Sequence, residues 1–320
     1  TAVVVGLGRV GQGYDYDITD DSIILTHATA LKYHPSFNLI GGVDQDIVQR
    51  ERFERKFSKP SYSSLGALRS VCQPSVVSIA VPTALHASVF RETMSSNTRA
   101  VVLEKPVADC IVEANDMLQV VESSGCVVLV NYLRRFNPAI VELKQMIERG
   151  QLGQIYKGTA WYTKGIIENG SHFVDLFQWL LGEQTSIQVM NAGRKWDNHD
   201  PEPDLCIRFG SADIYLLAGR EENYCMGRFE LVGTKGMIHY EDGKPIKTYF
   251  SQEDPIYAGY RNIGNEHNIA NDKESNIWYA YDNLANHLLN GVKLESSLKT
   301  GIKTLKTIEK IISLWNRNNE

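Results

Sequence analysis

Short apolar runs and longer helical patterns alternate over the first 130 residues of the chain. The apolar runs are rich in β-branched residues and lie at 2–5, 39–43, 76–80, 100–103 and 127–130, and the helical patterns lie at 22–34, 47–57, 65–71, 87–95 and 111–123. Because the runs are apolar at consecutive positions, we expect strands that are covered on both faces. Such strand–helix repetition predicts a doubly wound parallel sheet of the Rossmann type.

The pattern changes after Tyr132. Helices are predicted at 138–149, 170–181, 278–289 and 298–315, and strands at 155–162, 187–192, 205–209, 213–218, 228–232 and 237–240. Residues 252–273 are polar and lack a period, so we expect a long loop there. Strands that follow one another between glycines favour a mostly antiparallel sheet. We therefore expect an α/β protein with a Rossmann domain at 1–130 and an α+β domain at 131–320.

Composition narrows the class of protein. With 43% hydrophobic and 22% charged residues the chain is globular, and its net charge of -5 gives no excess of positive charge for nucleic acid or an anionic membrane. No apolar run approaches the length of a membrane span, and we see no signal peptide. The five cysteines form no CxxC pair, which suits a reducing compartment. We expect a cytoplasmic protein.

A glycine-rich loop follows the first predicted strand directly. The loop consists of Gly6, Leu7, Gly8, Arg9, Val10 and Gly11, with the spacing G-x-G-x-x-G. In this context Gly6 permits a tight turn, Gly8 lets the backbone approach a pyrophosphate, and Gly11 lets a helix pack close to the strand. The N-terminus of that helix would add N–H donors and a positive dipole. The motif predicts a bound dinucleotide, and the alternative is an ordinary tight turn.

Asp44 ends the second predicted strand, where a carboxylate accepts hydrogen bonds from the adenosine ribose and repels a 2′-phosphate. We therefore predict NAD as the cofactor, with NADP disfavoured. Gly11 and Asp44 are 33 residues apart, more than the usual spacing of about 20. The extra length is an acidic insertion at 14–21, which we interpret as a solvated loop rather than a site.

Two further motifs follow the third and fourth strands. Pro82 and Thr83 would turn the chain over the cofactor, and His86 is either a cofactor contact or a satisfied polar residue at a helix start. Glu104 and Lys105 come directly after an apolar strand, at the sheet edge where α/β folds bind ligands. The alternative for this charged pair is a surface ion pair of little energetic value.

Taken together and in order, the motifs resemble the Gfo/Idh/MocA oxidoreductases, the family of glucose–fructose oxidoreductase and inositol dehydrogenase. The motifs are the glycine loop, Val43-Asp44, Val81-Pro82-Thr83 with His86, Glu104-Lys105-Pro106, Asn131-Tyr132 with Arg134-Arg135-Phe136-Asn137-Pro138, Gly150 with Gly153, Gly170-Ser171-His172-Phe173-Val174-Asp175, and Gly233-Thr234-Lys235-Gly236. The resemblance implies a second domain with a large open-faced sheet that packs against another subunit, hence a homodimer or homotetramer. It also implies hydride transfer between NAD and a secondary alcohol or ketone of a sugar, cyclitol or nucleotide sugar.

The resemblance carries two catalytic residues onto this chain, Lys105 and His172. The family often has aspartate four residues before the histidine, and this chain has Glu168. Removing a hydride from a carbinol requires a base for the hydroxyl proton and a positive group for the developing alkoxide. We assign His172 as the base and Lys105 to orienting the hydroxyl, although a desolvated lysine can also act as base.

Glu168 and Asp175 flank His172 at spacings of four and three. If the helix includes Glu168, its carboxylate shares a face with the imidazole; if the helix starts at Gly170, Glu168 lies in a loop. Asp175 either orients His172 or is a first-turn acid favoured by the helix dipole. These three side chains are also conceivable metal ligands, but hydride transfer needs no metal and we predict none.

The remaining substrate-binding candidates are Tyr132, Arg135 and Lys164, alongside Lys105, Glu168, His172 and Asp175. Arginine after the last strand of the first domain would hold a phosphate, a carboxylate or a sugar, or else it forms an interdomain ion pair. Tyr132 lines the site or packs the sheet. The alternative to an enzyme is a regulatory protein of the same fold that senses a dinucleotide without turnover.

Overall fold

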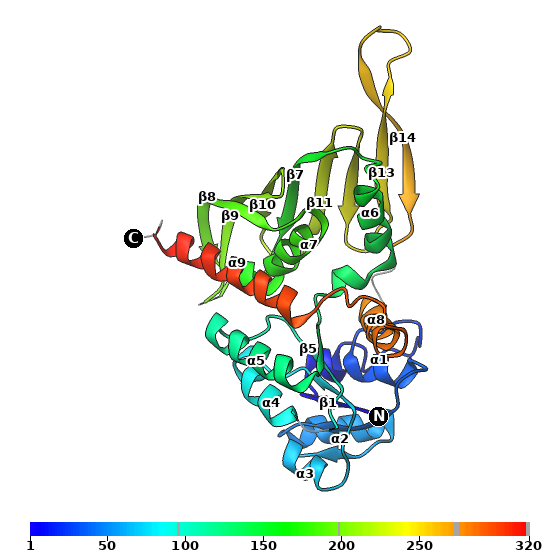
Figure 1. Ribbon diagram of the computed structural model, residues 1–320, viewed down its shortest axis with the longest axis vertical. Helices are drawn as coiled ribbons and strands as arrows, with labels where there is room; N and C mark the ends of the chain where they lie inside the picture. Colours follow the sequence, from blue (N-terminus) through cyan, green and yellow to red (C-terminus); the bar gives the residue numbers. More distant parts are fainter. Residues whose placement is uncertain (95–96, 198, 272–274, 318–320) are drawn as a thin grey trace. The chain divides into compact units, whose positions relative to one another are not determined.

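The computed structural model describes residues 1–94, 97–197, 199–271 and 275–317, and it divides into two compact units (Figure 1). The first unit comprises Thr1–Phe136 and Glu274–Leu305, and the second comprises Asn137–Lys273 and Lys306–Glu320. Ser95, at the end of a predicted helix, and residues 272 and 273, at the end of the predicted loop, lie outside the described residues.

A six-stranded parallel sheet forms the centre of the first unit, in the order β3-β2-β1-β4-β5-β6. Its strands are β1 (Ala2–Val5), β2 (Leu39–Val43), β3 (Ser61–Tyr62), β4 (Val76–Ile79), β5 (Ala100–Leu103) and β6 (Val127–Val130). The order reverses at β1, as in a doubly wound sheet. The predicted Rossmann fold is confirmed, and the two-residue β3 is an addition that its polar sequence did not reveal.

Helices cover both faces of this sheet. They are α1 (His27–Tyr33), α2 (Ile47–Phe57), α3 (Leu65–Arg69), α4 (His86–Thr93), α5 (Ile111–Ser124), α8 (Asn276–Asn290) and the first turns of α9 (Leu298–Arg317), with 3-10 turns η2 (Thr83–Leu85) and η3 (Leu133–Phe136). Ile277 and Tyr281 of α8 belong to the apolar cluster around Ala2 and Val4. Leu298 and Ile302 of α9 belong to the cluster around Val3 and Val5 on the opposite face. Residues 274–305, assigned by the sequence analysis to the second domain, thus complete the core of the first unit.

The second unit is built on an eight-stranded sheet in the order β14-β13-β12-β11-β7-β10-β9-β8. Its strands are β7 (Ile155–Tyr162), β8 (Gln184–Lys195), β9 (Pro201–Phe209), β10 (Ala212–Ala218), β11 (Gly227–Gly233), β12 (Gly236–Glu241), β13 (Ile246–Glu253) and β14 (Arg261–Ile269). The pair β7–β10 is parallel and the other pairs are antiparallel, which confirms the prediction of a mostly antiparallel sheet.

The prediction of a loop at 252–273 is wrong for residues 261–269, which form the strand β14. This strand pairs with β13 from Arg261 to Ile269, and in Figure 1 the two form a hairpin that projects beyond the other strands of the sheet. Most β14 side chains are exposed, so the strand carries no apolar alternation. Backbone pairing with β13 therefore determines its conformation, and side-chain pattern alone could not predict it.

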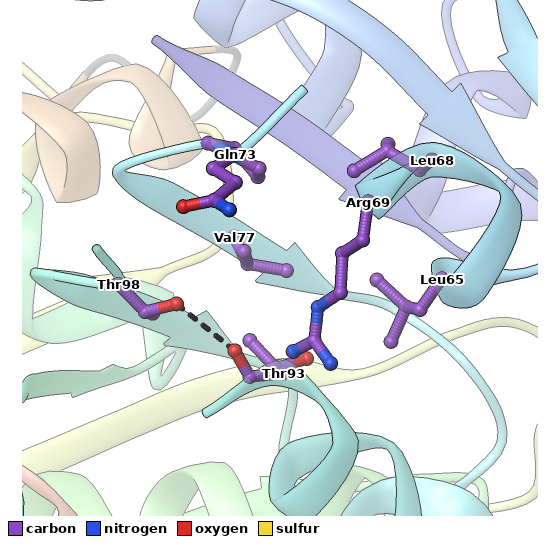
Figure 2. Close-up of a pocket in the computed structure, with 8 residues that line it drawn as sticks. Leu65, Leu68, Arg69, Gln73, Val77, Thr93 and Thr98 are labelled. Carbon is purple, nitrogen blue, oxygen red and sulfur yellow. Dashed lines mark hydrogen bonds between the residues drawn. The ribbon is translucent and has the colours of Figure 1, made fainter. Parts of the chain in front are cut away.

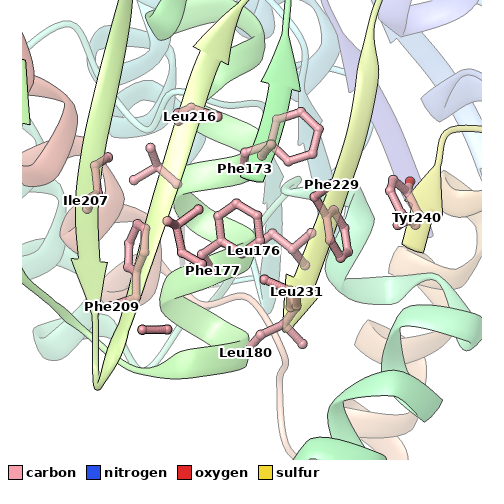
Figure 3. Packing of buried hydrophobic residues seen from close by; sticks show 14 of the residues in the cluster. Phe173, Leu176, Phe177, Leu180, Ile207, Phe209, Leu216, Phe229, Leu231 and Tyr240 are labelled. Carbon is pink, nitrogen blue, oxygen red and sulfur yellow. The ribbon is translucent and has the colours of Figure 1, made fainter. Parts of the chain in front are cut away.

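Helix α7 (Ser171–Leu181) contributes Phe173 and Phe177 to the aromatic core of the second unit (Figure 3). Phe173 and Phe177 lie against Phe229 of β11, with ring centroids 6.5 and 5.5 Å apart, and Phe177 also contacts Phe209. The core also includes side chains from α6 (Pro138–Glu148) and, at Ile308 and Ile311, from the last turns of α9. Burial of this face fixes α7, and with it the residues of its first turn.

Candidate functional site

The glycine loop after β1 has the backbone geometry that its spacing predicts. Gly6 has φ +91°, and a Cβ there would lie 2.6 Å from the carbonyl carbon of Ala80. A Cβ on Gly11 would overlap the carbonyl oxygen of Gly6. Gly8 is exposed and has no heavy atom within 4 Å of the position of a Cβ. The loop is therefore closely packed behind Gly6 and Gly11 and open in front of Gly8, where a phosphate could approach the backbone.

The structure does not place the N-terminus of a long helix beside the glycine loop, although the motif led us to expect one there. Arg9–Gly13 forms a single π-helical turn, η1, in which the N–H groups of Gln12 and Gly13 both donate to the carbonyl oxygen of Gly8. The first long helix, α1, begins only at His27. Arg9 is exposed and Val10 is half-buried on this turn. The positive end of a long helix dipole is thus missing from the loop, and backbone N–H groups remain as its anion donors.

The interpretation of the 14–21 insertion as a solvated loop is wrong for Asp15, which is 1% exposed. Its carboxylate accepts hydrogen bonds from the N–H groups of Leu25 and Thr26 at 2.9 and 3.0 Å and from the hydroxyl groups of Thr26 and Thr29. Lys56 of α2 places its ammonium 3.6 Å from the same carboxylate. Asp15 therefore fastens the insertion to the start of α1.

Asp44, at the end of β2, binds the glycine loop and lines the pocket beside it. Its Oδ2 accepts a hydrogen bond of 2.7 Å from the N–H of Leu7, and its Oδ1 accepts one of 2.9 Å from the N–H of Asp46. The pocket has a volume of about 350 Å³, and its lining includes Gly6, Gly8, Asp44, Ser63 and Pro82. A bare glycine backbone next to a half-buried carboxylate fits the phosphate and the ribose of a dinucleotide.

Figure 2 shows a second, smaller cavity of about 90 Å³ under α3 and α4. Leu65, Leu68 and Val77 line it, Arg69 donates to the carbonyl oxygen of Glu92, and Thr98 donates to the carbonyl oxygen of Thr93 at 2.9 Å. None of the predicted site residues lines it. Its size suits a few ordered waters rather than a substrate.

His86 links the ends of β4 and β5. It is 1% exposed, its Nδ1 lies 2.8 Å from the carbonyl oxygen of Pro106, and its Nε2 lies 3.0 Å from that of Val81. Burial lowers the pKa of His86, and the carbonyl contacts offset part of that effect. This geometry gives His86 a structural role, because it joins the turn of Pro82 and Thr83 to the turn of Lys105.

Glu104 lies in a hydrogen-bonded network at the end of β5. His27 Nε2 is 3.0 Å from its Oε1, and the Asn131 side-chain amide donates to the same oxygen at 2.6 Å. The Nδ1 of His27 is 2.7 Å from the Tyr281 hydroxyl group. Burial raises the pKa of Glu104, but the hydrogen bond and charge of His27 and the Asn131 amide outweigh burial, so the pKa lies below its ordinary value.

This network supports Lys105, whose backbone N–H donates to Glu104 Oε2 at 3.3 Å and whose side chain is half-buried. Glu104 is thus a structural carboxylate, while Lys105 follows it at the carboxyl edge of the sheet. The sequence analysis missed His27, Asn131 and Tyr281 as parts of this network. They lie 27 to 254 residues from their partners, so no local motif marks them.

Tyr132 and Arg135, two of the predicted substrate-binding residues, are 1% and 3% exposed. Tyr132 belongs to the apolar cluster around Val3 and Val5. The Arg135 guanidinium donates to the carbonyl oxygen of Glu295 at 3.0 Å and so binds the returning 274–305 segment within the first unit. Both side chains pack within the first unit, and their contact with a substrate stays a prediction.

In the second unit, His172 and Asp175 lie on the first turn of α7, and they are 8% and 1% exposed. Glu168 is exposed and lies in η4 (Gly165–Gly170), a π-helical turn that leads directly into α7. Glu168 is therefore outside the α-helix but on the turn that begins it. The Lys164 ammonium, at the start of this turn, lies 3.1 Å from Glu221.

Among the described residues, no group of three or more His, Cys, Asp or Glu side chains is arranged to hold a metal ion. In the part of the chain that the structure describes, every helix is too short or too polar to cross a membrane.

Comparison with known proteins agrees with this geometry. Residues 1–132 match the model for the NAD-binding Rossmann fold of an oxidoreductase family. Residues 165–313 match the model for the C-terminal alpha/beta domain of the same family. The chain belongs to the Gfo/Idh/MocA oxidoreductase family. Its first domain has the family's NAD-binding fold, and the predicted family and cofactor are confirmed.

Among curated relatives, the scyllo-inositol 2-dehydrogenase (NAD(+)) of Bacillus subtilis (strain 168) is 28% identical over 265 residues, covering 73% of this chain and 72% of the relative. The levoglucosan dehydrogenase of Pseudarthrobacter phenanthrenivorans is 25% identical over 241 residues, covering 59% of this chain and 61% of the relative. The chain thus covers less than two thirds of the length of several of these relatives, with shares of 54% and 61% for two of them and 41% for a third.

Solved structures with the same fold cover nearly the whole chain. An NAD binding oxidoreductase from Klebsiella pneumoniae superimposes with a TM-score of 0.78 at 17% identity, covering 99% of this chain and 97% of that one. An oxidoreductase from Agrobacterium radiobacter in complex with NAD+, L-tartaric acid and magnesium has a TM-score of 0.77 at 14% identity, covering 99% and 96%. At these identities the likeness shows the fold alone.

Proposed function

We propose that this member of the family is an NAD-dependent dehydrogenase that transfers hydride between the nicotinamide and a secondary alcohol or ketone of a cyclitol, a sugar or a nucleotide sugar. The observation that carries the proposal is Lys105, held by the Glu104 network at the carboxyl edge of the same sheet as the glycine loop and Asp44. A regulatory protein that only senses a dinucleotide has no use for a lysine at this position. Relatives named inositol 2-dehydrogenase and levoglucosan dehydrogenase support the substrate class.

The chain's own residues divide into those that bind the cofactor and those that handle the substrate. The glycine loop would hold the pyrophosphate and Asp44 the ribose. When bound, the cofactor supplies the hydride chemistry at its nicotinamide ring. Lys105 orients the reacting hydroxyl group and stabilises negative charge on its oxygen, and His172 exchanges its proton. Glu168 and Lys164 lie on the turn before His172 and are further predicted substrate contacts, together with Tyr132, Arg135 and Asp175.

A panel of polyols tests the proposal. The purified protein is mixed with NAD and, separately, with myo-inositol, scyllo-inositol, levoglucosan, glucose and a uridine-diphosphate sugar, and the absorbance of reduced nicotinamide is followed. We expect turnover with at least one member. NAD binding by calorimetry with no turnover across the panel, in both reaction directions, would favour the sensing protein instead.

The substitution Lys105→Met tests whether the protein is a dehydrogenase or a protein that only senses a dinucleotide. Methionine keeps the length and apolar part of the side chain but removes the charge. We expect kcat/KM to fall by about a thousandfold, in the range that single charge-stabilising donors contribute, while the NAD dissociation constant changes little. Retained turnover would remove Lys105 from the mechanism. The exposed Lys299→Met, on α9, is the matched control.

We also propose that the chain forms a homodimer or homotetramer through the eight-stranded sheet. In β9 the apolar Leu205, Ile207 and Phe209 are buried on the helix side, while Cys206 and Arg208 face the other way. On that second face Trp161 is only half-buried, leaving apolar area for a partner. Sedimentation of the protein and of Trp161→Asp distinguishes an oligomer from a monomer.

A further inference from the structure

Two buried carboxylates hold the turn that precedes α7. The carboxylate of Asp200 accepts hydrogen bonds from the N–H groups of Ile167 and Glu168 at 2.8 and 2.9 Å. The carboxylate of Glu202 accepts from the N–H groups of Lys164 and Gly165 at 3.1 and 3.4 Å. Asp200 is 5% exposed and Glu202 is 2% exposed. Four backbone N–H groups of one short turn therefore donate to two side chains, that of Glu202 in strand β9 and that of Asp200 directly before this strand.

The backbone of the turn depends on these acceptors. Lys164 and Gly165 both have positive φ, +64° and +74°, in the left-handed region that a lysine rarely adopts. A Cβ on Gly165 would overlap the carboxylate of Asp200. Such a conformation persists only where the surroundings hold it. The carboxylates of Asp200 and Glu202 occupy the positions that do so.

Glu202 is itself fixed by an ion-pair chain. The Nε of Arg194 on β8 donates to the carboxylate of Glu202 at 2.8 Å, and its Nη1 and Nη2 donate to the carboxylate of Glu222 at 2.6 Å. The hydrogen bonds from Arg194 lower the pKa of Glu222 to about 2, so the ion pair between Arg194 and Glu222 stays charged at every pH at which the protein would be assayed. Asp200 has no such cation among its described contacts, and it holds its two N–H groups alone.

We infer that Asp200 and Glu202 are positioning residues, which hold the Lys164–Glu168 turn in the conformation that presents its side chains to substrate and that starts α7 one residue before His172. Protonation of Asp200 releases part of this turn. The role in substrate binding rests on the proposed function above. The anchoring itself does not, because it follows from contacts within the second unit.

The groups around Asp200 raise the pKa of its carboxyl group. Burial raises the pKa of Asp200 to about 6, the N–H groups of Ile167 and Glu168 lower it, and the charges of Asp197 and Glu168 raise it further. Burial and the charges of Glu202, Asp200 and Asp204 raise the pKa of Tyr162 of β7, so these groups also belong to the ionisable surroundings of Asp200. A protonated carboxyl group presents an O–H toward one of its two N–H partners, so one hydrogen bond is lost.

Hydrogen–deuterium exchange of the full-length protein tests the anchor without any substrate. Protection factors, corrected for the intrinsic effect of pH, are measured for the peptide that contains Lys164–Glu168 between about pH 7 and about pH 5. In the unmodified protein we expect protection to fall across this interval with a midpoint near that of Asp200. In Asp200→Asn, which keeps the size but offers one acceptor, we expect protection at neutral pH to be about tenfold lower, as for one lost hydrogen bond, and independent of pH.

Asp213→Asn is the matched control, because that carboxylate is paired with Arg208 on the sheet and contacts no part of the turn. It should leave exchange of the turn unchanged. Should Asp200→Asn fold poorly, the pH series on the unmodified protein decides alone. Equal protection of the turn at both pH values, or a loss spread evenly over the second unit, would overturn the inference.

Kinetics then separates this inference from the proposed function. With a polyol that the panel shows to be turned over, Asp200→Asn should raise KM severalfold with the NAD dissociation constant unchanged, and the acid rise in KM of the unmodified protein should disappear. Silence of the whole panel contradicts the proposed function, whereas the exchange experiment still decides whether Asp200 holds the turn.

Discussion

At the scale of single residues, Asp44 has two roles that substitution can separate. Its carboxylate accepts the N–H of Leu7 in the glycine loop and lines the dinucleotide pocket. Asp44→Ala removes both the anchor and the charge, whereas Asp44→Asn keeps an oxygen for Leu7 and removes only the charge. We expect both variants to bind NADP better relative to NAD, by about tenfold or about 1.4 kcal/mol, because a 2′-phosphate no longer meets a negative charge.

The two variants should differ in absolute affinity for NAD. Asp44→Ala should also lose roughly 1–2 kcal/mol of NAD binding as the loop loosens, and Asp44→Asn should lose less. Titration calorimetry with NAD and NADP gives both quantities. Selectivity that stays the same in both variants would contradict the role of Asp44 in choosing the cofactor.

Single residues also show what a sequence can reveal. Gly6, Gly11 and Asp44 belong to a local motif whose spacing follows from backbone geometry, so their placement was predictable. His86 and Arg135 have the residue types of a binding site, yet both side chains are buried and form hydrogen bonds with backbone carbonyl oxygens. A pattern of residue types does not tell whether a polar side chain faces a ligand or satisfies a backbone group, because that depends on the surrounding fold.

At the scale of elements, the junction between α1, β5 and α8 rests on the contact of His27 with Glu104 and Tyr281. His27→Leu keeps the volume but leaves the Glu104 carboxylate without its main partner. We expect the free energy of unfolding at neutral pH to fall by about 3–5 kcal/mol, as when one member of a buried pair is removed. Tyr281→Phe removes one hydroxyl group and should cost only about 1 kcal/mol. Urea unfolding measures both.

The pH dependence gives this prediction a direction. In the unmodified protein the pKa of Glu104 is lowered on folding, so its contribution to stability is present above the unfolded value and is lost as pH falls through the folded value. In His27→Leu burial is opposed only by the Asn131 amide and the charge of Lys105, so the pKa of Glu104 rises relative to the unmodified protein and the stabilising contribution of the carboxylate is reduced. The stability difference between the two proteins should therefore shrink as the solution becomes acidic. A difference that stays constant with pH would mean that the loss comes from packing.

Elements with an apolar period were predictable, and those held by polar contacts were not. The parallel strands and helix α7 follow from runs of apolar residues that need burial. The start of α1 at His27 follows instead from the N-cap Thr26, whose side chain accepts a hydrogen bond from the N–H of Thr29, and the buried Asp15 holds both threonines in place. The π-helical turns at Arg9–Gly13 and Gly165–Gly170 likewise depend on tertiary contacts and have no pattern of their own.

At the scale of the whole molecule, α9 contributes to both cores. Ile302 belongs to the apolar cluster of the parallel sheet, and Ile311, nine residues later, belongs to the cluster of the eight-stranded sheet. The sequence analysis predicted the helix correctly and assigned all of it to the second domain. Its amphipathic pattern shows that one face is buried, but an apolar stripe does not tell which sheet covers it.

Two matched substitutions on this one helix test the division into units. Ile302→Ala and Ile311→Ala each remove the same atoms from a site that is at most 4% exposed, so each should cost about 2–5 kcal/mol. We expect Ile302→Ala to speed hydrogen exchange in β5 and β6 and to weaken NAD binding at elevated temperature. Ile311→Ala should instead speed exchange in β9 and β10, and NAD, which binds the first unit, should restore little of its stability. If either substitution loosened both sheets equally, the two cores would unfold as one cooperative unit, and α9 would be the element that couples them.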